Sequence, residues 1–347
     1  MSFSTFLDSI NCYNNPMSKK LDFLAIGDIV IDAFIELEDA NVSCDINRAN
    51  CTLSMRFADK IPYRDVTVIK AVGNSPNAAT SAARLGLSVG LLTHIGGDEN
   101  GRDCIDTLKE NGIDTALVQI ENKAKTNYHY VLSYEAERTI LIKHEAYNYK
   151  FIAPDTAPAW VYLSSVGNDT LAYHEDIADY LEQNPEIKLA FQPGTFQMKL
   201  GTEKLAGLYK RTKVFFCNKE EAQRILGNKE EDIKVQMNNL HALGPKLVCI
   251  TDGPNGAYAS DGANAWFIPM YPDPKPPVER TGAGDAFSST VTAMLVLGKP
   301  LETAITYGPV NSMNVVQYVG AQAGLLTLPE IEKWLAKAPE DYKVKEI

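Results

Sequence analysis

The chain has 347 residues, of which 45% are hydrophobic and 22% charged, a globular composition that excludes wholesale disorder. Its net charge is −11 and its Lys and Arg residues are not clustered, which disfavours a nucleic-acid partner. Every apolar run is far shorter than the roughly 18 residues of a membrane helix, so no membrane partner is expected.

The opening stretch lacks the basic start and apolar centre of a signal peptide. We therefore expect residues 1–20 to be an N-terminal extension and the protein to be cytoplasmic. The six cysteines form no Cys-x-x-Cys pair, and Cys217 and Cys249 lie inside apolar runs, which favours reduced thiols.

From Leu21 onward, short apolar runs alternate with helical patterns. Ser75 and Pro76 start one predicted helix that Gly86 ends, and a second helix is predicted before Gly112. This alternation predicts a layered α/β sandwich over residues 21–335, with a C-terminal tail at 336–347. The predicted strands of its mainly parallel sheet are residues 23–26, 89–95, 160–165, 188–191, 214–217 and 247–250.

Two stretches, residues 33–71 and 117–144, contain strand-like runs without helices between them. They predict one small, separate β-sheet that covers an edge of the main domain as a lid. Apolar residues such as Leu53, Met55 and Phe57 on an exposed face of this sheet favour a homodimer through the lid.

The most informative segment, residues 280–297, reads RTGAGDAFSSTVTAMLVL. Its first half is rich in glycine. Its second half has one apolar helical face, formed by Phe287, Val291, Met294 and Leu295. The pattern predicts a Gly-rich loop that leads into a helix N-terminus. A dinucleotide fingerprint is disfavoured, because its glycines follow the first strand of a βαβ unit.

Such a loop directs backbone N–H groups toward an anion, and the helix dipole adds to the attraction. Here these groups belong to Gly282, Ala283 and Gly284. Asp285 then lies where its carboxylate can accept a proton from a nucleophile beside the anion. The alternative is that Asp285 is only a favourable acidic residue in the first helical turn.

The run from Thr281 to Phe287 resembles the second signature of the ribokinase-like (pfkB) carbohydrate kinase family. The resemblance implies a three-layer α/β/α fold and ATP-dependent phosphorylation of a hydroxyl on a sugar-like molecule, with ATP and Mg²⁺ as cofactors. It also implies that Asp285 is the general base and that the amides of Gly282, Ala283 and Gly284 form an anion hole.

Two earlier segments resemble the acceptor side of this family. In the first, the family implies that Asp32 holds sugar hydroxyls, and a solvated loop carboxylate is the alternative. In the second, Gly73 and Asn77 match the first signature, but Val72 replaces its first glycine, and Val cannot readily adopt a positive φ. The resemblance places Gly73, Asn74 and Asn77 at the substrate, although Asn74 would also suit a helix cap.

Two later segments resemble the nucleotide side. Asn218 and Glu221 match the family's Asn-x-x-Glu, which implies that Glu221 organises magnesium, a cation that prefers oxygen ligands. A charged helix start is the alternative. Thr251, Gly253 and Gly256 resemble the Gly-x-x-Gly turn that borders the nucleotide, and an ordinary hairpin turn is the alternative.

The chain departs from the family before the Gly-rich loop, where Glu279 and Arg280 replace Asp-Thr. The Asp helps to coordinate potassium in some members, so activation by a monovalent cation is undecided.

Two other functions stay open. A nucleoside such as adenosine would suit the same kind of site, with Tyr128, Tyr130 and Tyr134 available to pack on a base. Val72 and Arg280 also leave room for a catalytically silent relative with a binding or regulatory role. Retention of Asp285 argues against that reading.

Overall fold

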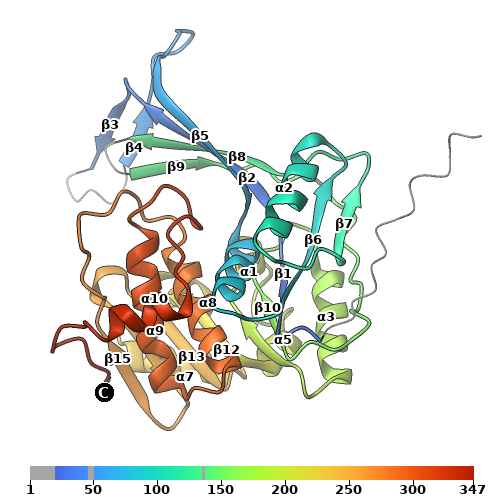
Figure 1. The fold of residues 1–347 in the computed structure, drawn as a ribbon, viewed down its shortest axis with the longest axis vertical. Helices are drawn as coiled ribbons and strands as arrows, with labels where there is room; N and C mark the ends of the chain where they lie inside the picture. The colour runs from blue at the N-terminus through green and yellow to red at the C-terminus, as the bar shows by residue number, and fades with distance from the viewer. Residues whose placement is uncertain (1–19, 46–50, 135–136) are drawn as a thin grey trace, which may run out of the picture.

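A computed structural model describes residues 20–45, 51–134 and 137–347, so the predicted extension lies almost entirely outside the described residues. A ten-stranded sheet forms the centre, in the order β16-β15-β14-β13-β12-β11-β10-β1-β6-β7 (Figure 1). The strands β13, β12, β11, β10, β1, β6 and β7 are parallel to one another. Strands β14, β15 and β16 add to one edge of the sheet as antiparallel strands. All six predicted strands belong to this sheet. The strands are β1 (Phe23–Ile26), β6 (Val89–Gly96), β7 (Val118–Glu121), β10 (Trp160–Leu163), β11 (Lys188–Phe191), β12 (Thr212–Asn218), β13 (Leu247–Thr251), β14 (Ala257–Ser260), β15 (Ala265–Ile268) and β16 (Lys345–Glu346).

Helices cover both faces of this sheet, which confirms the predicted three-layer sandwich. The central strands β1 and β6 are buried throughout, because each face packs against helices. One face carries α1 (Asn74–Arg84), α2 (Glu99–Glu110), α8 (Ala283–Val296), α9 (Leu301–Val315) and α10 (Leu328–Leu335). The other carries α3 (Leu171–Gln183), α4 (Thr195–Leu200), α5 (Ala206–Arg211), α6 (Lys219–Leu226) and α7 (Ile233–Ala242). No helix among the described residues is long and apolar enough to cross a membrane.

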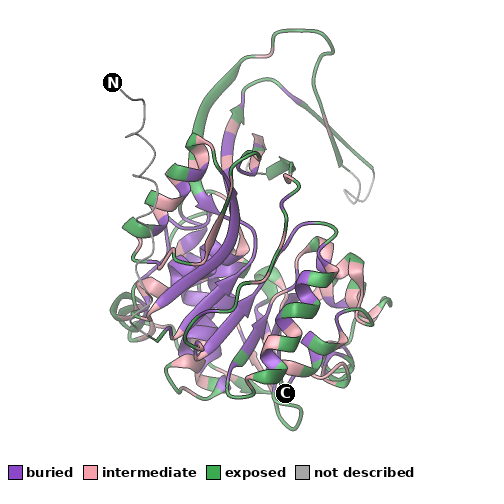
Figure 2. Cartoon of the chain, turned by 90° about the vertical axis from the view of Figure 1, so that its right-hand side faces the viewer, coloured by how far each residue is buried: buried purple, intermediate pink, exposed green. Residues whose placement is uncertain are grey.

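A second, four-stranded sheet projects from this body, and much of its surface is exposed (Figures 1 and 2). Its order is β5 (Tyr63–Val72), β2 (Val30–Leu37), β8 (Tyr128–Tyr134) and β9 (Glu137–Leu141). Strands β2 and β8 are parallel, and the outer pairs are antiparallel. The observed arrangement differs in two places from the single small sheet that we expected. β7 follows the α2 crossover and pairs with β6. Among the described strands, β3 (Asn41–Cys44) and β4 (Cys51–Ser54) pair only with each other.

The prediction of reduced thiols was wrong for Cys44 and Cys51, which form a disulfide. They are opposite partners in the β3–β4 hairpin, with their Cα atoms 4.1 Å apart, a spacing short enough for a bridge. The sequence did not reveal the pairing, because β3 carries no periodic signal. Cys104, Cys217 and Cys249 are free and buried, and Cys12 lies outside the described residues.

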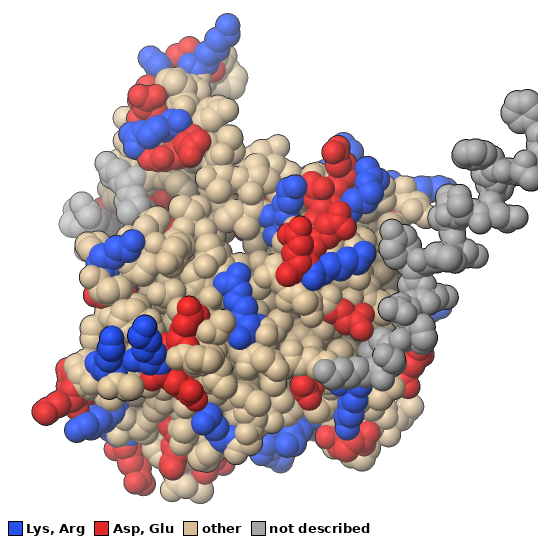
Figure 3. Space-filling view, in the orientation of Figure 1, with Lys and Arg blue, Asp and Glu red and all other residues tan. Residues whose placement is uncertain are grey.

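Acidic and basic side chains are interspersed on the face shown in Figure 3, where neither sign forms an extended field. The predicted C-terminal tail is partly built into the fold. Strand β16 extends the main sheet beside β15, and the buried Tyr342 donates a hydrogen bond to the carbonyl oxygen of Thr306.

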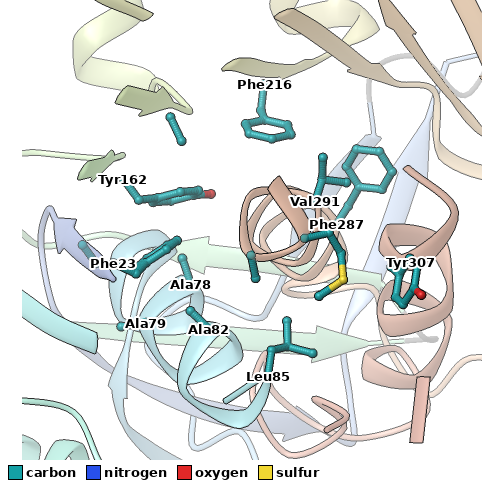
Figure 4. Close-up of a cluster of buried hydrophobic side chains, with 14 of the residues drawn as sticks. Phe23, Ala78, Ala79, Ala82, Leu85, Tyr162, Phe216, Phe287, Val291 and Tyr307 are labelled. Atoms are coloured by element: carbon teal, nitrogen blue, oxygen red, sulfur yellow. The ribbon is translucent and has the colours of Figure 1, made fainter. Parts of the chain in front are cut away.

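The core between the sheet and one helical layer brings α1 close to α8 (Figure 4). Helix α1 presents Ala78, Ala79 and Ala82, and these small side chains permit a close approach to its neighbours. The Tyr162 ring stacks on Phe23, 5.4 Å between centroids, and its hydroxyl points toward α8. The N-termini of α1 and α8 therefore lie at the same edge of the sheet.

Candidate active site

Polar residues gather where the parallel strands end, which is the usual site of ligand binding in open α/β sheets. Asp28 follows β1, Gln192 follows β11, and Asn218 and Thr251 end β12 and β13. The N-termini of α1 and α8 point to the same edge, so residues from six segments of the chain can meet there.

Asp285, in the first turn of α8, is the centre of this site. It is buried, with 8% of its surface exposed, and three side-chain amides donate hydrogen bonds to its carboxylate. Asn74 and Gln192 donate to Oδ1 at 2.7 and 3.2 Å, and Asn77 donates to Oδ2 at 2.8 Å. Burial raises the pKa of the Asp285 carboxyl, and these hydrogen bonds oppose the rise by stabilising the charged form.

The amides are held in turn by other side chains. Gln322 donates to Asn77 Oδ1 at 3.0 Å and to the carbonyl oxygen of Ala71 at 2.8 Å. Ser288, one turn along α8, donates to Gln192 Oε1 at 3.0 Å. The orientation of the Asp285 carboxylate is therefore fixed by a connected network.

The residues predicted to form the anion hole lie at the start of helix α8, as the sequence predicted. Gly282 has φ of 79°, and a Cβ there would lie 2.3 Å from the Ala321 side chain, so a larger residue would not fit. The first N–H groups of a helix have no partner inside it, so those at the start of α8 are available to an anion.

Ala283 and Gly284 line a pocket of about 570 Å³ together with four other predicted nucleotide-side residues, namely Asn218, Thr251, Gly253 and Gly256. The turn at Gly253–Asn255 is a short 3₁₀ helix between β13 and β14. Gly256 has φ of 102°, and a Cβ there would lie 2.4 Å from the carbonyl oxygen of Ile268. A hairpin turn and a pocket wall are thus the same segment.

Asn218 and Glu221 form a capping box at the start of α6. The side chain of Asn218 accepts from the Glu221 backbone at 2.7 Å, and Glu221 Oε2 accepts from the Asn218 backbone at 2.8 Å. Burial raises the pKa of Glu221, and the nearby Asp285 charge adds to the rise. The structure thus shows the helix start directly, and the role of the Glu221 carboxylate at magnesium stays a prediction.

On the acceptor side, the sequence reasoning missed two histidines and gave Asp28 no role. Asp32 Oδ1 lies 3.4 Å from His129 Nδ1, because β2 and β8 place the two residues in register. Asp28 Oδ2 lies 3.2 Å from His144 Nδ1, and Tyr149 donates to Asp28 Oδ1 at 2.7 Å. No local pattern marks these pairs.

The two pairs lie together, with 5.3 Å between the imidazole centroids of His129 and His144. The buried oxygens Oδ2 of Asp28 and Oδ1 of Asp32 have no hydrogen-bond partner within the described residues. Each of these oxygens faces an imidazole without a hydrogen bond to it, so each can still accept a hydrogen bond from a hydroxyl-bearing ligand.

The first-signature residues occupy the junction between Asp28 and Asp285. Gly73 has φ of 118°, and a Cβ there would lie 2.8 Å from the carbonyl oxygen of Asp28. Val72 is buried and pairs with Val30 in β5–β2, and the positive φ beside it belongs to Ala71, at 56°. Val72 is therefore accommodated without adopting the glycine conformation.

The three lid tyrosines do not converge. Tyr128 packs against the main core and lies 5.2 Å from the Tyr130 ring, while Tyr130 is exposed. Tyr134 lines a different cavity, beneath the four-stranded sheet. Tyr128 and Tyr130 are therefore neighbours on β8, and Tyr134 lies apart from them.

The side chains of Glu279 and Arg280 have different surroundings. The Glu279 carboxylate accepts from the Thr281 hydroxyl at 2.7 Å and from the Gly320 backbone at 2.6 Å, so it ties two loops together. Arg280 lines the pocket beside Ala283. Glu279 thus has a structural use.

Comparisons with known proteins agree with this architecture. The family model "pfkB family carbohydrate kinase" matches residues 47–328. Ribokinase of Bacillus subtilis is 25% identical over 309 residues, which cover 80% of this chain and 94% of that protein. A nucleoside kinase of Methanocaldococcus jannaschii, an archaeal member of the ribokinase family, has a TM-score of 0.76 and 18% identity over 92% of this chain and 99% of its own. Arabidopsis thaliana ribokinase complexed with ribose and ATP has a TM-score of 0.74 and 18% identity, over 91% and 99%.

Proposed function

Because the chain belongs to the pfkB family of carbohydrate kinases, we propose that it transfers the terminal phosphoryl group of ATP to a hydroxyl of a sugar or sugar-like molecule. The observation that carries the proposal is the Asp285 carboxylate, buried and held by three amides beside the start of α8. A carboxylate so placed can accept a hydroxyl proton next to a bound phosphate.

In this reaction, Asp285 takes the proton from the acceptor hydroxyl. The hydroxyl oxygen bonds to the γ-phosphorus, and the bond from that phosphorus to the β-phosphate oxygen breaks. ADP leaves with the electron pair. The N–H groups of Gly282, Ala283 and Gly284 stabilise charge on the transferred group, so catalysis consists mainly of positioning and electrostatics.

The pocket lined by Asn218, Thr251, Gly253 and Gly256 suits the nucleotide, and Arg280 is placed to contact its phosphates. Glu221 fits a role with magnesium, because it supplies a hard oxygen ligand while its Oε2 holds the helix start. Magnesium, when bound, neutralises phosphate charge.

For the acceptor, we propose an uncharged sugar held by Asp32, Gly73, Asn74 and Asn77. The Asp28 and Asp32 carboxylates, each beside one histidine, disfavour a phosphorylated acceptor at this wall, and their oxygens can accept hydrogen bonds from hydroxyls. A nucleoside is the second candidate, favoured by the likeness to the archaeal nucleoside kinase.

The test is ADP release by the purified protein with MgATP and a panel of free sugars, sugar phosphates and nucleosides. Turnover with an unphosphorylated sugar is expected, and turnover with a nucleoside alone would replace the acceptor assignment. Binding of ATP without turnover on any acceptor would instead favour a silent binding or regulatory protein.

We also propose that two copies pair through the four-stranded sheet. One exposed apolar row crosses this sheet and consists of Val68, Tyr130 and Leu141. Ala33 is the register partner of both Val68 and Tyr130, and Tyr130 is in turn the partner of Leu141. Sedimentation at high concentration should show a dimer that Tyr130→Asp converts to a monomer. A strictly monomeric wild type would overturn the pairing.

A further inference from the structure

The two oxygens of the Asp285 carboxylate are unequally occupied. Oδ1 accepts two hydrogen bonds, from Asn74 at 2.7 Å and from Gln192 at 3.2 Å, whereas Oδ2 accepts one, from Asn77 at 2.8 Å. An ionised carboxylate has about four lone-pair sites, two on each oxygen. Oδ1 is therefore filled, and one site remains on Oδ2.

We propose that Oδ2 is the oxygen of Asp285 that receives the acceptor proton, and that Gln192 is a positioning residue that fills Oδ1 together with Asn74. This inference rests on the proposed function, since it concerns the same base. Gln192 makes the two oxygens chemically distinct. Without its amide, a second lone-pair site opens on Oδ1, while Asn74 and Asn77 still hold one site on each oxygen.

Gln192 is itself held by two side chains. Its Oε1 accepts from the Ser288 hydroxyl at 3.0 Å and from the buried Tyr162 hydroxyl. The Tyr162 and Ser288 oxygens lie 2.7 Å apart. Both hydroxyls face Oε1, although the single hydrogen of Ser288 is also within reach of the Gly284 carbonyl oxygen at 2.9 Å. Because Oε1 faces these donors, Nε2 faces Asp285, and the amide does not present an acceptor to the carboxylate.

The charge environment of Asp285 is otherwise simple. Burial raises the pKa of Glu221 on α6 and of Tyr162 on β10, and the Asp285 charge adds to both rises. Of the helices packed along α8, α1 contributes Arg84, whose guanidinium binds backbone carbonyls of residues 322 and 325, and α9 contributes Tyr307. Gln192 is thus a neutral donor whose removal changes the carboxylate directly.

The experiment is the pH dependence of kcat/KM for the full chain and for two variants at Gln192. Gln192→Met removes the donor at similar length, so the acid limb that reports Asp285 should move up by about one pH unit. Gln192→Glu places a second carboxylate beside Oδ1 and should move the limb further. The ATP concentration for half-maximal rate should stay unchanged.

A purely structural role predicts a different outcome. Gln236, another buried glutamine, lies in α7 and donates to the Glu230 carbonyl oxygen, so Gln236→Met is the matched control. It should lower the melting temperature and leave the acid limb in place. If Gln192→Met does not fold, Ser288→Ala, which releases Gln192 from one side, should shift the limb the same way by a smaller amount.

The Asp285→Asn variant distinguishes a failure of the proposed function from a failure of the role given to Gln192. If Asp285→Asn keeps near wild-type turnover, the base assignment fails and this inference fails with it. If Asp285→Asn is inactive while the folded Gln192 variants leave the acid limb unmoved, the proposed function stands and only the division between Oδ1 and Oδ2 is overturned.

Discussion

The main body and the four-stranded sheet with its hairpin differ in how deeply their strands are buried. Strands β1 and β6 are buried along their whole length, whereas β3 and β9 are exposed along theirs (Figure 2). A strand packed on both faces has little freedom, so the loops at its end are held closely. Asp285 and the pocket that we propose for the nucleotide therefore belong to the rigid body.

The projecting sheet supplies the other wall. Asp32 on β2 meets His129 on β8, while Asp28 and Asp285 belong to segments of the body. One half of the site therefore belongs to the rigid main body, and the other half belongs to the single four-stranded sheet. Changes in the body should reduce catalysis or folding strongly, and changes at the far end of the projection should do little.

The largest expected effect is that of Asp285→Asn, which removes the proton acceptor at the junction. It should lower kcat by roughly 10²- to 10⁴-fold with little change in ATP affinity, since the backbone amides remain. Asp232, which caps α7, is the matched control, because Asp232→Asn should cost at most about 1 kcal/mol of stability and no turnover. An active Asp285→Asn variant would remove the catalytic assignment.

Next in size is Phe287→Ala in the core beneath Asp285. Phe287 is buried, with its ring 6.5 Å from that of Phe216, and its loss should cost about 3 to 5 kcal/mol in the free energy of unfolding. Ile142, exposed beyond β9, offers the comparison, because Ile142→Ala should change stability by less than about 0.5 kcal/mol. Urea unfolding of both variants measures the contrast, and equal losses would contradict it.

A smaller effect is expected for Glu221→Gln, which keeps the shape of the capping box and removes its charge. The magnesium concentration for half-maximal rate should rise by roughly 10- to 100-fold, the usual cost of weakening a metal's surroundings. Glu231→Gln, on an exposed residue paired with Lys219, should leave it unchanged. An unaltered magnesium requirement in Glu221→Gln would place the metal role elsewhere.

The smallest effect should come from the hairpin. Breaking the bridge with Cys44→Ser and Cys51→Ser removes about 2 to 3 kcal/mol of restraint on a short loop, but β3 and β4 pair only with each other. The main melting transition should stay in place, while trypsin should cut faster at Arg56 and Lys60. A lowered melting temperature would show that the hairpin stabilises the body.

Much of the body followed from local sequence patterns. The strand at 188–191 and the Gly-rich start before Asp285 were predicted, because burial on both faces and helix punctuation act over a few residues. Gln192 was missed although a signal existed, since it is polar and directly follows a predicted parallel strand. The histidines had no such signal.

What the sequence by itself determined was the alternation of strands and helices, the layered α/β fold that it predicts, and the Gly-rich helix start before Asp285, all of which depend on neighbours along the chain. The tertiary structure alone decided which distant side chains meet. Gln192 reaches Asp285 across 93 residues and Asn74 does so across 211, and Asp32 meets His129 only through the register of β2 and β8. Such contacts leave no periodic trace, because they arise from how elements pack and not from how each one forms.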